Sequence, residues 1–122
     1  MDLLDQAKQK LATSLKIINA AEDYTQSIKQ ILQALDDGLQ FSKQHYSALN
    51  SLAMTKDKNL NGADIYFFFM RFTHQFFNVM NIIQTIPNAS YFEKFQHIIH
   101  IRQQRFDEVR ADAIAQANKI LG

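Results

Sequence analysis

Residues 63–86, ADIYFFFMRFTHQFFNVMNIIQTI, form the most aromatic stretch of this 122-residue chain. Its polar side chains recur at helical spacing and form a narrow strip: Arg71, His74, Asn78, Asn81 and Thr85. The remaining arc, about 240° of the helix circumference, is apolar, which is wider than a helix packed on one side needs. The stretch therefore predicts a helix over 63–86 that contacts neighbours on two sides and ends before Pro87.

Three further helices are predicted from apolar stripes at helical spacing. The first covers about 3–19, with Asp2 as its N-cap. The second covers about 23–54, and its stripe differs in azimuth from the first by roughly 110°. That difference predicts a break within NAAEDYT, residues 19–25, although a supercoil would merge the two into one long bent helix. The last covers about 91–121, where Ser90 and Glu93 match a capping box.

The connections between these helices are short and polar. The clearest loop is TKDKNLNGAD, residues 55–64, which contains an Asn-Gly pair. Glycine and proline are otherwise rare, and no stretch alternates as a β-strand does. We therefore predict an all-α, antiparallel up-down four-helix bundle that forms a single domain over 1–122.

The composition argues against several classes of protein. The absence of cysteine excludes disulfides, cysteine zinc sites and thiol catalysis. A formal net charge of +1 gives no basis for a nucleic-acid partner, and Arg71 is the only basic residue in the aromatic run. The start, MDLLDQAKQK, is no signal peptide, and no stretch of about 20 predominantly apolar residues predicts a membrane span. We expect a soluble, cytoplasmic protein.

The histidines raise the question of a metal site. Glu93, His97 and His100 are spaced i, i+4, i+7, so they share one face of the last helix. The neighbouring phenylalanines are expected to face the core, so the face with Glu93, His97 and His100 points outward. Metal ligands in helical bundles project inward. His45 lies between two apolar rows of the second helix and is expected to be partly buried. We predict no metal and no cofactor. A metal site built from His45, His97 and His100 is the alternative.

The arginines all lie in the second half of the chain. Arg102 falls within the apolar stripe of the last helix, so it must be paired, lie at the edge of the bundle or face a partner. Asp36 or Asp37 could pair with it if the second and fourth predicted helices are neighbours. Phe67 lies on the polar side of its helix and is the expected exposed anchor. The candidates for binding a partner are Phe67, Arg71, Arg102, Arg105 and Arg110.

No pattern in the chain indicates catalysis. It contains no nucleophile with its base, no phosphate-binding glycine loop and no paired-carboxylate site. The preferred hypothesis is a non-enzymatic helical module of the adaptor, chaperone-like or immunity type that binds another protein or itself. The first alternative is a metal-binding bundle. The second is peripheral membrane association through the 63–86 helix, exposed when the bundle opens.

Overall fold

The computed structural model describes residues 2–56, 62–84 and 92–122, and the side chains within them except those of 25, 55, 56, 62, 81–84 and 92–99. These ranges contain five α-helices and no β-strand: α1 (Leu3–Ala20), α2 (Tyr24–Gln44), α3 (Tyr46–Lys56), α4 (Gly62–Gln84) and α5 (Phe92–Leu121). The all-α prediction is confirmed. The predicted end of the third helix at Pro87 and the capping box at Ser90 lie outside the described residues.

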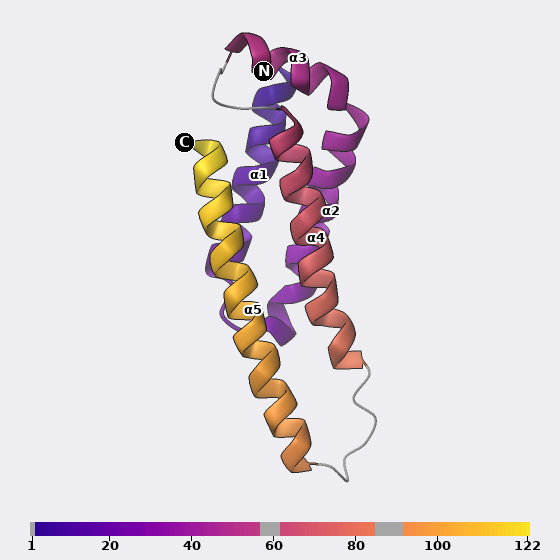
Figure 1. Cartoon of the computed structure of the whole chain (residues 1–122), viewed down its shortest axis with the longest axis vertical. Coiled ribbons are helices and arrows are strands. Elements are labelled where there is room, and N and C mark those ends of the chain that lie inside the picture. The colour runs from indigo at the N-terminus through magenta and orange to yellow at the C-terminus, as the bar shows by residue number, and fades with distance from the viewer. Residues whose placement is uncertain (1, 57–61, 85–91) are drawn as a thin grey trace.

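The four long helices pack side by side with alternating direction. α1 packs against α2 and α5, and α4 packs against the same two helices from the other side (Figure 1). The shorter α3 lies across the end where α2 finishes and α4 begins, and it contacts both α1 and α4. At the opposite end, α5 extends past the turn between α1 and α2 (Figure 1). α4 thus contacts neighbours on several sides, as its wide apolar arc predicts.

α1 begins and ends where the sequence indicates. The Asp2 Oδ1 atom accepts a hydrogen bond from the Asp5 amide at 2.9 Å, which confirms Asp2 as the N-cap. After Ala20 the chain becomes extended at Ala21, and α2 starts at Tyr24. The predicted break is therefore present, and the alternative of one merged helix over 3–54 is wrong.

The prediction of one continuous helix over 23–54 is also wrong, because this segment divides at His45 into α2 and α3. The backbone hydrogen bonds continue through the division, from the His45 amide to Phe41 and from the Leu49 amide to His45. One turn earlier, the buried Ser42 hydroxyl donates to the Gly38 carbonyl oxygen at 2.7 Å. A serine bonded in this way competes with the helical ladder and often bends a helix.

Aromatic rings from three helices form the centre of the core. The rings of Phe69, Phe72, Phe76 and Phe106 are completely buried. Phe106 of α5 lies between Phe76 of α4, at a centroid distance of 5.8 Å, and Tyr24 of α2, at 6.2 Å. Such ring pairs contribute about 0.5–1.5 kcal/mol each beyond the burial of their area. This cluster fixes α4 against its neighbours and so determines which side of α4 faces outward.

Candidate functional site

The outward side of α4 carries large apolar side chains. Phe67, Met70 and Phe77 are 50%, 43% and 45% exposed, and His74 is exposed between them. We call Phe67, Met70, His74 and Phe77 the α4 stripe. Its spacing of three, four and three residues places all four side chains along one line of the helix. The exposure predicted for Phe67 from its azimuth is confirmed.

A groove of about 450 Å³ adjoins the stripe, between the first half of α4 and the last turns of α5. Its apolar lining comes from Phe67, Phe68 and Phe72 on α4 and from Ile120 and Leu121 on α5. Arg71 and Lys119 lie at the same groove, one from each helix. Phe67 belongs to both the groove and the stripe. The groove depends on how α4 and α5, which are about 50 residues apart in sequence, are offset along their axes. The sequence pattern did not predict it.

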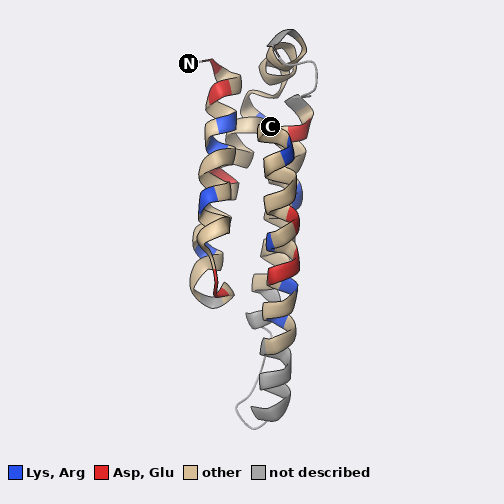
Figure 2. Ribbon diagram, turned by 90° about the vertical axis from the view of Figure 1, so that its left-hand side faces the viewer, with Lys and Arg blue, Asp and Glu red and all other residues tan. Residues whose placement is uncertain are grey.

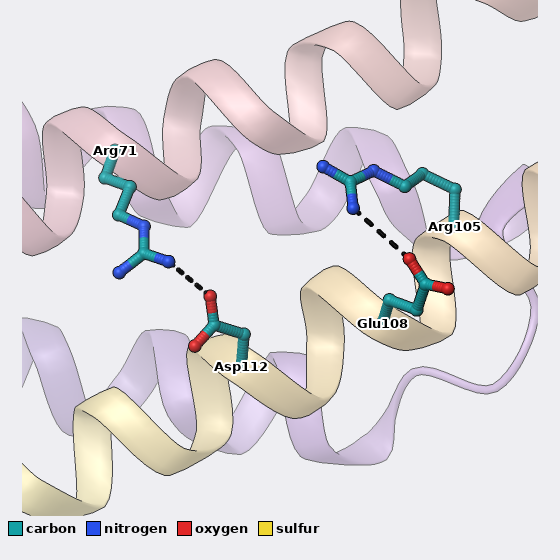
Figure 3. Close-up of polar contacts among 4 residues, drawn as sticks. All are labelled: Arg71, Arg105, Glu108 and Asp112. Atoms are coloured by element: carbon teal, nitrogen blue, oxygen red, sulfur yellow. Dashed lines mark hydrogen bonds and ion pairs between the residues drawn. The ribbon is translucent and has the colours of Figure 1, made fainter.

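Arg71 joins α4 to α5 beside this groove. Its Nη2 atom binds Asp112 Oδ2 (Figure 3). The Arg71 guanidinium also lies 4.9 Å from the centroid of the Phe72 ring. Arg105 forms a second ion pair further along α5, with Glu108 at 3.2 Å (Figure 3). Both pairs are largely exposed, and exposed pairs contribute about 0–1 kcal/mol to stability. Both guanidiniums lie at the surface, where a partner's carboxylate could reach them.

Arg110 instead contacts the end of α1. Its Nε atom donates to the carbonyl oxygen of Ile18 at 2.9 Å, and Nη2 donates to that of Asn19 at 2.6 Å. The last carbonyls of a helix have no partner within the helix, and a basic side chain there also complements the helix dipole. Arg110 therefore caps the C-terminal end of α1. The sequence pattern did not predict these contacts, because the partners of Arg110 lie about 90 residues away.

Gln103 makes similar contacts with the turn between α1 and α2. Its Nε2 atom donates to the carbonyl oxygen of Glu22 at 3.1 Å and to Asp107 Oδ1 at 3.0 Å. Its Oε1 atom accepts a long hydrogen bond, 3.5 Å, from the Tyr24 amide. Gln103 and Arg110 lie seven residues apart on α5, so the same face of α5 holds both the end of α1 and the following turn.

Arg102 is half-buried near Tyr24, and its Nε atom has no hydrogen-bond partner among the described residues. Burial lowers the pKa of Arg102, an effect that Tyr24 partly opposes. Burial likewise raises the pKa of Tyr24, and the positive charge of Arg102 acts in the opposite direction. Tyr24 and Arg102 thus lie close enough to interact electrostatically, in a site that is partly shielded from water.

The proposed pairing of Arg102 with Asp36 or Asp37 is wrong. Asp37 binds Lys10 of α1 at 2.7 Å, and Asp36 accepts a hydrogen bond from Gln40 at 3.4 Å. α2 meets α5 at its first residue, Tyr24, and the aspartates lie about 18 Å further along α2. The premise that the helix containing Asp36 runs beside the last helix therefore fails.

The candidate metal ligands are not brought together in the described part of the chain. His45 lies at the junction of α2 and α3, where its ring is 4.7 Å from that of Phe41. The junction lies at the opposite end of the molecule from the start of α5, which carries the exposed His100 (Figure 1). The side chains of Glu93 and His97 lie outside the described ones. Among the described residues, no group of three or more His, Cys, Asp and Glu side chains could hold a metal ion.

Along the ribbons of α1, which starts at the N-terminus, and α5, which ends at the C-terminus, positions of basic and acidic residues are interspersed (Figure 2). No helix within the described residues is long and apolar enough to cross a membrane. Comparison with protein-family models, with curated proteins and with solved structures finds no match to this chain. The surface itself is therefore the basis for inferring function.

Proposed function

We propose that this chain is a non-catalytic protein-binding module that uses the α4 stripe to bind a helix of another protein or of a second copy. In this proposal α1, α2, α4 and α5 form an antiparallel up-down four-helix bundle, and α3 covers one end of it. The observation that carries the proposal is the exposure of Phe67, Met70 and Phe77 on one line of α4, although Phe68, Phe69, Phe72 and Phe76 of the same helix are buried.

Leaving these apolar side chains exposed to water costs free energy. A half-exposed phenylalanine presents about 100 Å² of apolar surface, so covering it contributes about 2 kcal/mol. Single exposed apolar residues are common, whereas several in one line are typical of an interaction site. Large aromatic side chains are also enriched among the residues that contribute most to binding.

The arginines make different contributions to the proposed interface. Arg71 lines the same groove as Phe67, and Arg105 lies at the surface of α5. Such charges at the rim of an interface mainly adjust the rate of association and the choice of partner. Arg110 binds the end of α1, and Arg102 is half-buried beside Tyr24, so we leave these two out of the proposed interface.

Capture of partners from a native lysate by the untagged, immobilised chain tests this proposal. The double variant Phe67→Ser with Phe77→Ser should lose the captured partner, because it removes the two largest side chains of the stripe. Met54→Ser is the matched control, since Met54 is 79% exposed on α3 and does not belong to the stripe. Thermal melting should show both variants folded. Equal capture by all three proteins would contradict the proposed surface.

A purified partner then allows a quantitative test. Titration calorimetry should give a dissociation constant that rises at least tenfold in the double variant, which corresponds to about 1.4 kcal/mol. Arg105→Ala should change the association rate and its dependence on salt more than it changes the dissociation rate. An unchanged dissociation constant in the double variant would refute the role of the stripe.

A further inference from the structure

We propose that the partner of the α4 stripe is the same stripe of a second copy, related by a two-fold axis with the two α4 helices antiparallel. This inference rests on the proposed function, because it uses the same surface and names its occupant. In such an isologous contact each residue of the surface meets a residue of the same surface. The stripe must therefore be complementary to itself when its direction is reversed.

The spacing of the stripe meets that requirement. Residues 67, 70, 74 and 77 are the a, d, a and d positions of two heptads, the pattern by which one helix packs along another. Reversal about the midpoint exchanges Phe67 with Phe77 and Met70 with His74. Phe67 of one copy then packs against Phe77 of the second copy, at both ends of the contact. Met70 packs against His74 of the second copy on both sides of the axis.

The paired side chains are also chemically compatible. Two phenylalanine rings form a favourable offset or edge-to-face pair. A methionine sulfur makes favourable contacts with an aromatic ring, and here the ring is an imidazole. The stripe contains no lysine, arginine, aspartate or glutamate, so self-pairing places no formally charged side chain against its own copy. A strongly charged partner would find little to pair with along this line.

The residues beside the axis support the same occupant. Arg71 flanks the stripe on the side of α5 and would approach Arg71 of the second copy. Each Arg71 is already paired with Asp112 of its own chain, so two compensated pairs meet rather than two free cations. On the other side of the stripe, the flanking residue nearest the axis is Thr73, which carries no charge.

The size of the contact sets the expected affinity. The stripe runs for about 15 Å along α4. Its exposed apolar side chains from two copies present roughly 600 Å² in total. Interfaces below about 1,200 Å² are typical of weak or transient complexes. We therefore expect a dimer whose dissociation constant lies in the micromolar range and which forms and separates readily.

Paired substitutions at the two central positions test the antiparallel arrangement directly. M70E/H74E places carboxylates against carboxylates across the axis and should weaken dimerisation more than tenfold. M70K/H74K should do the same with ammonium groups, and an equimolar mixture of these two variants should recover dimers. M70E/H74K places Glu against Lys in every cross-pair of the antiparallel contact, so it should keep a dissociation constant within about tenfold of the wild type.

Sedimentation equilibrium of the full chain over about 1–500 µM gives these dissociation constants. Circular dichroism and melting temperature check that each variant is folded, because like charges four residues apart on α4 cost a few tenths of a kcal/mol. Equal weakening of M70E/H74K and M70E/H74E would overturn the antiparallel pairing. A wild-type chain that remains monomeric throughout would overturn self-association. The proposed function would then depend on capture of a different protein by the same stripe.

Discussion

Gly38 of α2 lies directly against the ring of Phe69 of α4. Both residues are buried, and a Cβ atom built at Gly38 would overlap the Phe69 ring. α2 and α4 therefore approach one another as closely as they do because residue 38 has no side chain. Phe69 contacts Phe68, which in turn contacts Phe72, so the contact with Gly38 helps to fix the orientation of α4 and thereby of its outward stripe.

Gly38→Ala should destabilise the protein by about 1–3 kcal/mol, because the added methyl group overpacks the core. The same change in an unconstrained helix would stabilise it by about 0.5–1 kcal/mol. Urea denaturation measures the free energy of unfolding. Phe69→Leu removes part of the obstructing ring, so the double variant should lose less stability than the sum of the two single variants. Strictly additive losses would show that the two residues do not compete for the same space.

Phe76 and Phe77 are adjacent in sequence, but truncation should destabilise the protein at Phe76 and leave its stability nearly unchanged at Phe77. Phe76 is completely buried against Phe106, so Phe76→Ala should cost about 3–5 kcal/mol of unfolding free energy. Phe77 is 45% exposed on the α4 stripe, so Phe77→Ala should change the stability of the monomer by about 0.5 kcal/mol or less. Chemical denaturation at low protein concentration measures both. Similar losses in the two variants would mean that Phe77 contributes to the core.

Arg110→Gln should destabilise the protein by about 1–2 kcal/mol, because it removes two charge-assisted hydrogen bonds from the last carbonyls of α1. Arg105→Gln is the matched control on the same helix, because Arg105 pairs with Glu108 at the surface. The control should change stability by less than about 0.5 kcal/mol. Hydrogen exchange should locate the effect of Arg110→Gln in the last turn of α1. Equal effects of the two substitutions would indicate that the charge of Arg110 matters and its contacts do not.

Sequence periodicity predicted those features that depend on one helix alone. The inward side of α4 and the exposure of Phe67 follow from spacing within one segment, and the Asp2 cap follows from the residue type at the start of α1. The break after α1 follows from the different azimuths of two consecutive apolar stripes. The division at His45 left no such signal, since no proline or glycine stands there and the backbone hydrogen bonds continue through it.

Features that depend on the relative placement of two helices were not predictable in this way. Arg110 reaches Ile18, and Gln103 reaches Glu22, across roughly 80–90 residues of sequence. The groove beside Phe67 likewise requires the relative height of α4 and α5. The incorrect pairing of Arg102 with Asp36 or Asp37 has the same origin, because it assumed a neighbour that the packing does not provide.

Stability should fall at alkaline pH because of Tyr24. Burial raises its pKa above the usual value of 10.0, so the folded chain holds the phenolic proton more tightly than the unfolded chain. The resulting stabilisation is fully present below pH 10.0 and is lost as the pH rises through the higher folded-state pKa. The wild type should therefore lose more unfolding free energy than Tyr24→Phe between about pH 9 and 11.

Arg102→Met should make the loss steeper, since the nearby positive charge opposes the rise in the Tyr24 pKa. Urea denaturation across this range, with tyrosinate absorbance as a second measurement, gives both slopes. Parallel pH profiles for the wild type and Tyr24→Phe would show that Tyr24 ionises equally in the folded and unfolded chains.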